Sequence, residues 1–73
     1  MSITVNVHGA VRGSFFFTQH ELGENFWRAI IGGDPDDVQE ARRLLSWELG
    51  ARGIRAQLIT FDWPSQSAEV IAQ

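Results

Sequence analysis

The fold is decided by one stretch, Asp34-Pro35-Asp36-Asp37-Val38-Gln39-Glu40-Ala41-Arg42-Arg43-Leu44-Leu45-Ser46-Trp47-Glu48-Leu49-Gly50. Asp34 is a favoured N-cap residue, because its carboxylate can accept hydrogen bonds from the free amides of a first helical turn. Pro35 suits the first helical position, where a missing N–H costs nothing. Asp36 and Asp37 place negative charge at the positive end of the helix dipole. The stretch therefore predicts a helix.

The same stretch carries an apolar stripe at helical spacing, made of Val38, Ala41, Leu45 and Leu49. Gly50 or Gly53 can end the helix. On a helical wheel, Trp47 lies about 180° from Val38, so it is the large apolar residue of the polar face.

Strands are predicted before and after this helix. Ile3, Val5 and Val7 alternate with polar residues, as in a half-buried strand. The run at 15–17, Phe15-Phe16-Phe17, favours a second strand in a hairpin with the first, and it places at least one ring opposite the other two. Residues 54–63 are apolar on both faces, which indicates a central strand or a covered surface. A turn follows at 64–67, and residues 68–72 form a weak final strand or a frayed helical turn.

Residues 19–31 allow two interpretations. Thr18 and Glu21 fit the capping-box pattern of a helix start. A helix would have an inner face of Leu22, Phe26, Ala29 and Ile30, extended by Trp27 and Ile31. The alternative is a turn at 22–24 followed by a strand at 25–31, which Gly23 and the β-rich composition favour. In either case Gly32-Gly33 breaks the chain before Asp34.

The order of elements, ββ(α)αβ(β), predicts a small two-layer α+β domain over residues 1–73. Its sheet would be a short antiparallel or mixed one of three or four strands, with one or two helices packed on one face. The chain of 73 residues has no Cys, so neither disulfides nor thiolate metal sites can supplement the core. We find no signal-peptide pattern and no apolar run of membrane-spanning length, and we expect a cytoplasmic protein.

The net charge of −3, with Arg as the only basic residue type, argues against direct binding to nucleic acid or to a membrane. Its field would favour a positively charged partner instead. Two groups of residues could provide the contact surface. One is the acidic helix start at Asp34, Asp36, Asp37 and Glu40, for which helix capping is the simpler explanation. The other is Trp47, because exposed Trp and Arg are enriched among binding hot spots.

Arg43 lies one turn before Trp47 and could hold the indole by a cation–π contact. The alternative is that Trp47 folds under the first helix or the C-terminal tail. The predicted partner-binding residues are Asp36, Asp37, Glu40, Arg43, Trp47 and Trp63, with Trp27 as a further candidate anchor.

Catalysis, metal binding and cofactor binding have little support in the sequence. His8 and His20 lie on different predicted elements, and no ligand spacing links them. The Gly and the distal Glu of a calcium-binding EF-hand loop are absent. No serine lies in a Gly-x-Ser-x-Gly turn, and no phosphate-binding glycine loop is present. A pairing of His8 with Glu21 as acid and base would depend on folding alone. A short chain also has little room for a drug-sized pocket, and we expect no enzyme.

The function we expect is that of a small acidic protein-binding module. It would occlude a basic surface of a larger partner, such as a nucleic-acid-binding groove, as phage-borne inhibitors such as anti-CRISPR proteins do. This analogy rests on size and charge alone. The alternative is a homodimeric structural or accessory subunit that buries the apolar segments at 15–17, 27–31 and 59–63 between two copies.

Overall fold

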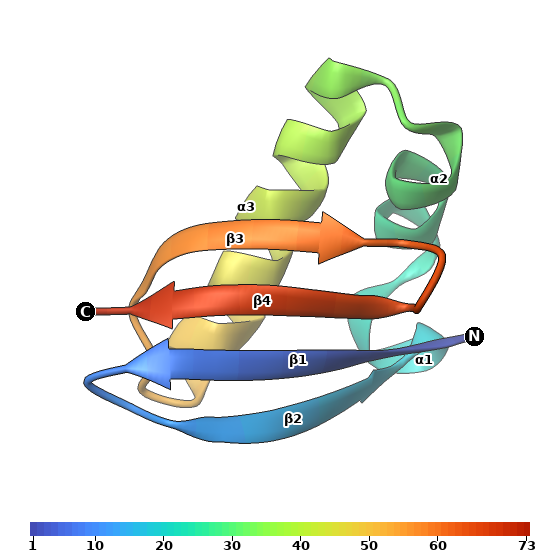
Figure 1. Cartoon of the computed structure of the whole chain (residues 1–73). Helices are drawn as coiled ribbons and strands as arrows, with labels where there is room; N and C mark the ends of the chain where they lie inside the picture. The colour runs from blue at the N-terminus through green and yellow to red at the C-terminus, as the bar shows by residue number, and fades with distance from the viewer.

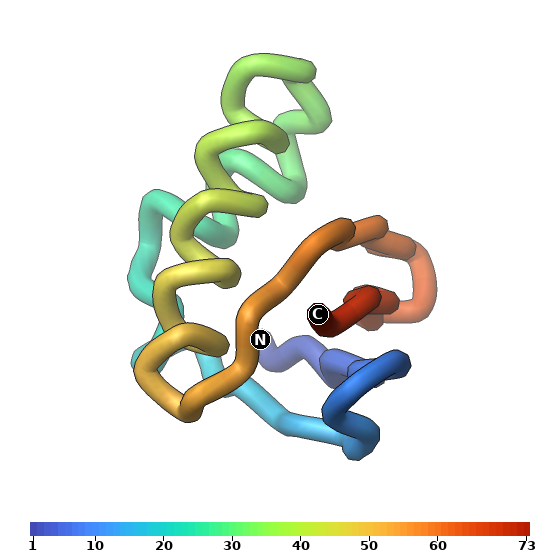
Figure 2. The backbone as a smooth tube through the Cα atoms, turned by 90° about the vertical axis from the view of Figure 1, so that its left-hand side faces the viewer, coloured from blue at the N-terminus to red at the C-terminus, as the bar shows by residue number.

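The protein consists of a four-stranded sheet with helices on one of its faces (Figures 1 and 2). The computed structural model describes all 73 residues. Its elements are β1 (Ser2–Gly9), β2 (Gly13–Thr18), α1 (Gln19–Leu22), α2 (Glu24–Gly32), α3 (Pro35–Ala51), β3 (Ala56–Asp62) and β4 (Ser67–Ala72). The strand order is β2-β1-β4-β3. The expected small two-layer α+β domain is confirmed.

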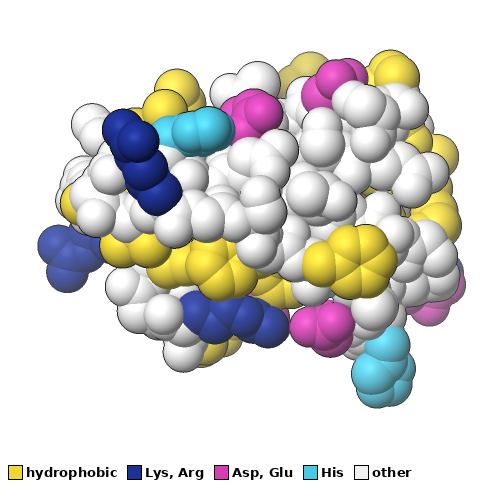
Figure 3. Space-filling view, turned by 60° about the horizontal axis from the view of Figure 1, so that its bottom comes forward, with side chains coloured by type: hydrophobic (Ala, Val, Ile, Leu, Met, Phe, Trp, Pro, Cys, Tyr) yellow, Lys and Arg dark blue, Asp and Glu magenta, His cyan; other side chains and the backbone are white.

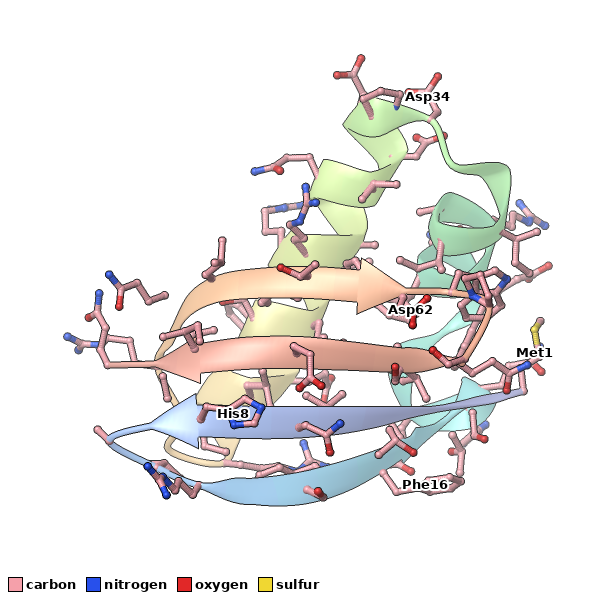
Figure 4. All side chains as sticks on the ribbon, in the orientation of Figure 1. Met1, His8, Phe16, Asp34 and Asp62 are labelled. Atoms are coloured by element: carbon pink, nitrogen blue, oxygen red, sulfur yellow. The ribbon has the colours of Figure 1, made fainter.

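The first hairpin follows the predicted pattern. Strands β1 and β2 are antiparallel, with Ile3 opposite Phe17 and Val5 opposite Phe15. Ile3, Val5 and Phe17 are buried under the helices, because alternate residues of a strand point to the same face. Phe16 points to the other face and is 62% exposed. The Phe16 ring is therefore the one of the three that no helix covers. Figure 4 labels it at β2, the lowest strand in that view.

The C-terminal segment is a central strand of the sheet. Strand β4 pairs in parallel with β1 and antiparallel with β3. Its inner side chains Ala68, Val70 and Ala72 are buried. Of the two interpretations of residues 68–72, the strand is confirmed and the helical turn is wrong. The small and β-branched residues of this segment give only a weak local signal for a strand. They nevertheless fit a central position in the sheet, with a neighbouring strand on either side.

Strand β3 lies at the edge of the sheet, so the central position considered for residues 54–63 is wrong. Its ladder with β4 is irregular between Ala56 and Leu58, as in a β-bulge. Ile59 is buried and Phe61 half-buried on the face toward the helices, whereas Leu58 is 59% exposed. Strand β3 therefore has apolar residues on both faces although the helices cover only one of them.

Residues 19–32 are helical, but they form two helices instead of one. The capping box is present: the Thr18 hydroxyl accepts from the Glu21 amide, and the Glu21 carboxylate accepts from the Thr18 amide. Gly23, with φ 83°, then ends α1, and α2 begins at the next residue. The strand interpretation of residues 25–31 is wrong. Most of the predicted inner face is buried, namely Leu22, Phe26, Trp27, Ala29 and Ile30, whereas Ile31 is exposed.

Helix α3 begins as predicted. The Asp34 carboxylate accepts a hydrogen bond of 3.0 Å from the Asp36 amide, and Pro35 takes the first helical position. Ala41, Leu45 and Leu49 are fully buried, while Val38 is half-buried. The helix ends at Ala51 with Arg52 as its C-cap, and Gly53 follows with φ 79°, so of the two glycines considered Gly53 ends the helix and Gly50 lies within it. In Figure 1 its first turns, near Asp34, rise beyond the edge of the sheet at β3.

One core of 17 residues joins the sheet and the helices, and every member is apolar. Phe26 makes edge-to-face contacts with Trp27 and Phe61, and the Trp27 indole N–H donates to the Gln19 carbonyl at 3.2 Å. No buried polar side-chain atom lacks a partner. In Figure 3, where the β2 side comes forward, the remaining apolar side chains appear between charged and polar ones. None of the helices has both the length and the hydropathy needed to cross a membrane.

Candidate functional site

One face of α3 carries the residues expected to bind a partner. Asp36, Glu40, Arg43 and Trp47 follow one another at spacings of four, three and four residues, which places them on one side of a helix. Trp47 is 79% exposed. The alternative in which this ring folds under the first helix or the tail is therefore wrong. An indole with this exposure leaves a large apolar surface in water, which is typical of a contact residue.

Ion pairing divides the acidic residues into two groups. Every glutamate forms an ion pair, and these pairs are His8–Glu69, Arg28–Glu24, Arg43–Glu40, Arg52–Glu21 and Arg52–Glu48. None of the aspartates does so. Asp34 caps α3, and Asp62 accepts from the Ser65 hydroxyl. The carboxylates of Asp36 and Asp37 have no partner and stand in the first turn of α3. Uncompensated negative charge is thus concentrated at the start of α3.

Glu40 and Arg43 are bound to each other. The two carboxylate oxygens accept from the guanidinium at 2.6 Å and 3.0 Å. This hydrogen bonding, with the attraction between the charges, lowers the pKa of Glu40 and raises the pKa of Arg43. The predicted cation–π contact between Arg43 and Trp47 is wrong, because the guanidinium is turned to Glu40. The cation–π contact that does form joins Arg52 to Phe17, at 4.5 Å from the ring centroid.

The other two tryptophans are less exposed than Trp47. Trp27 is 1% exposed and belongs to the core. Trp63 is half-buried and packs against it, with ring centroids 5.6 Å apart and planes inclined by 58°. The prediction of Trp27 as an anchor is wrong, because its ring is buried in the core. Trp63 lies in the β3–β4 turn and is half-buried, and its role as a contact residue stays a prediction.

A groove runs between α3 and the edge strand β3. Its volume is about 1,100 Å³, and it is open to solvent along its length. Asp36, Glu40, Arg43 and Trp47 line it on the helix side, and residues 56–60 line it on the strand side. In Figure 2, α3 and β3 stand side by side with β4 beyond β3.

The strand side of the groove is a sheet edge that no other strand covers. The Ile59 carbonyl faces α3 and accepts a hydrogen bond of 3.1 Å from the Nε of Arg42. Another nitrogen of the same guanidinium donates to the Gln39 side chain at 3.1 Å. Arg42 therefore bridges the groove floor, and both of its interactions are internal to the protein.

No protein-family model, no curated protein and no solved structure matches this chain.

The two histidines lie away from the groove. His8 projects from the open face of the sheet (Figure 4) and approaches Glu69 at 3.0 Å. Asn6 donates to Glu69 and accepts from the Ser14 hydroxyl at 2.8 Å, so a polar chain crosses β2, β1 and β4. His20 is exposed in the first turn of α1. No three His, Cys, Asp or Glu side chains are grouped so that they could hold a metal ion.

The acid–base pair considered from the sequence does not form. Glu21 belongs to the capping box and pairs with Arg52, while His8 pairs with Glu69 on the other face of the sheet. Sequence reasoning also missed Leu58 and Arg42 as parts of the candidate surface. The available sequence signal for Leu58 was a strand with apolar residues on both faces, one of which has to remain exposed if the strand lies at an edge. No local pattern indicated a role for Arg42.

Proposed function

We propose that this protein is a protein-binding module that contacts its partner with the face of α3 defined by Asp36, Asp37, Glu40, Arg43 and Trp47. The observation that carries the proposal is the 79% exposure of Trp47 on the same helix as two carboxylates without partners. A large aromatic ring provides apolar contact area, and uncompensated charges select an oppositely charged surface. No reaction of its own is part of the proposal.

The partner we propose is a larger protein with a basic surface, and binding would occlude that surface. Asp36 and Asp37 carry charge that no arginine of this chain neutralises, and the chain as a whole has a net charge of −3. A nucleic-acid-binding groove is a strongly basic surface, so inhibition of such a protein, in the manner of phage-borne anti-CRISPR proteins, belongs to this proposal.

The homodimeric alternative has less surface to bury than the sequence suggested. Of the apolar segments at 15–17, 27–31 and 59–63, most side chains lie in the core of one protomer. Phe16 and Ile31 remain more than half exposed, on separate elements. Light scattering distinguishes the two functions, since a stable dimer would favour self-assembly and a monomer would favour a different partner.

The experiment that tests the proposal is affinity capture from the lysate of the native host, with quantitative mass spectrometry. The baits are the native protein, Trp47→Ala and the double variant Asp36→Asn/Asp37→Asn. The matched controls are Phe16→Ala, which removes an exposed ring elsewhere, and Glu24→Gln/Glu69→Gln, which removes two charges elsewhere. We expect a partner that both α3 variants lose and both controls retain, with weaker capture at high salt. Equal capture by all five baits would contradict the proposal.

A further inference from the structure

We infer that the open edge of β3 takes up an extended segment of the partner as a fifth strand of the sheet, and that this segment carries apolar and basic side chains. The inference rests on the proposed function and specifies its binding mode. Strand addition to an exposed sheet edge is a general route of peptide recognition, in which main-chain hydrogen bonds give affinity and side-chain contacts give selectivity.

The main chain of β3 is oriented for such an addition. The Ile59 carbonyl points away from β4, as its hydrogen bond to Arg42 shows. In an antiparallel pair, the N–H and C=O of one residue point to the same side, and residues two apart are equivalent. The amides of Ile59 and Phe61 therefore face the groove, and neither is used in the ladder with β4. Arg42 occupies the Ile59 carbonyl, so the amides of Ile59 and Phe61 are the groups through which this edge can pair with a further strand.

The groove wall sets the chemistry of the added segment. Trp47 on the helix side and Leu58 on the open face of β3, opposite Ile71, are both more than half exposed, so they offer apolar contact area to the two faces of an added strand. Asp36 lines the same groove on the helix side, with Asp37 next to it, and has no ion-pair partner. Arg43 is paired with Glu40, whereas Arg42 bonds only to the neutral Ile59 carbonyl and the Gln39 amide and keeps its charge. The negative charge offered to a ligand is therefore that of Asp36 and Asp37, at the helix-start end of the groove, and its complement there is a Lys or Arg side chain.

A second copy of this chain fits the edge less well than a basic segment. Pairing two β3 edges would bring together two chains of net charge −3, each with the same uncompensated aspartates. The arginines nearest the groove are already engaged by groups of their own protomer. A partner with free Lys or Arg side chains avoids this repulsion.

The test uses a defined probe, an end-blocked octapeptide of the sequence Lys-Thr-Lys-Thr-Val-Thr-Val-Thr. In an extended strand its Lys and Val side chains share one face. The reversed sequence serves for the opposite strand direction. Binding is followed by amide NMR shifts and hydrogen exchange. We expect one of the two peptides to bind, with slowed exchange at the amides of Ile59 and Phe61 and a shift of the Trp47 indole signal.

Three controls isolate the proposed mode. A peptide with alternate backbone amides methylated keeps every charge but lacks the N–H donors along one of its edges. Its affinity should be lower by about tenfold or more, because a tenfold loss corresponds to about 1.4 kcal/mol of binding free energy. A peptide with Glu in place of Lys should also bind more weakly. Leu58→Lys should reduce binding, whereas Ile71→Lys, an exposed residue of β4 outside the groove, should not.

The outcomes separate this inference from the proposed function. Equal affinity of the methylated and unmethylated peptides, or no change at the Ile59 and Phe61 amides at millimolar peptide, would overturn strand addition. Host-partner capture that depends on Trp47 would then still support the proposed function. Dimerisation of the free protein with protected Ile59 and Phe61 amides would assign the edge to a second copy and would also overturn the inference. Loss of the α3 dependence in the capture experiment would refute the proposed function itself.

Discussion

The Nε of Arg42 in α3 donates a hydrogen bond of 3.1 Å to the main-chain carbonyl of Ile59 in β3. This contact joins the helix to the free edge of the sheet, and it satisfies a carbonyl that no neighbouring strand can reach. It also fixes the spacing between the two walls of the groove.

Arg42→Ala should lower the free energy of unfolding by about 1 kcal/mol, because it removes a hydrogen bond from a charged donor to a partly buried carbonyl. Urea denaturation measures the change. Arg12→Ala is the matched control, since Arg12 is exposed, carries the same charge and forms no ion pair or side-chain hydrogen bond; it should change stability by less than about 0.5 kcal/mol. Equal effects of the two variants would show that the contact does not stabilise the fold.

Gly9→Ala should destabilise the protein by about 2 kcal/mol or more. Gly9 has φ 115°, and a Cβ there would collide with the carbonyl oxygen of Ala72, where β1 and β4 end side by side. Gly32→Ala is the control, because nothing lies near a Cβ at that helical position and its φ is not positive. It should stabilise by about 0.5–1 kcal/mol. Thermal unfolding of both variants tests the difference, and two changes of the same sign would contradict it.

Trp47→Ala and Trp27→Ala should differ strongly in stability. Trp27 is buried between Phe26 and Trp63, so its removal leaves a cavity and should cost about 3–5 kcal/mol. Trp47 lies in solvent, and its removal should change stability by less than about 0.5 kcal/mol. Acrylamide should quench the emission of the native protein but quench that of Trp47→Ala much less. A large stability loss in Trp47→Ala would mean that its ring is covered.

Arg43→Ala should raise the pKa of the Glu40 carboxyl toward its ordinary value. In the native protein the hydrogen bonds from Arg43 favour the ionised form, so the pKa of Glu40 is lowered. A carboxyl whose pKa is lower in the folded than in the unfolded state stabilises the fold above the unfolded pKa, and this stabilisation is lost as pH falls through the folded pKa. A carbon-13 NMR titration of the Glu40 side chain measures the shift. Arg42→Ala, whose partners are Gln39 and Ile59, should leave the Glu40 titration unchanged.

Signals between residues close in sequence predicted most of the elements. The Asp34 cap, the capping box of Thr18 with Glu21 and the alternation of Ile3, Val5 and Val7 each specify local structure within a few residues, and the structure contains all of them. Gly23 gave an equally local signal, but one that could be understood either as a turn before a strand or as a break. The structure uses it to separate two helices.

The candidate site could be predicted only in part. The helical spacing of Asp36, Glu40, Arg43 and Trp47 follows from the sequence, because a helix fixes which side chains share a face. Which tryptophans are exposed does not follow from it. The packing of α2 against the β3–β4 turn buries Trp27 and covers part of Trp63, and no local pattern indicates that packing.

By itself the sequence determined α3, most of the strands and the negative charge at the start of α3, because caps, periodicity and composition act over a few residues. Only the tertiary structure decided that the weakly marked segment 67–72 lies in the centre of the sheet, that β3 lies at its edge, and that α3 stands beside that edge. Strand order depends on pairings between distant residues and on which combination buries one common core. No local pattern in the chain carries that information.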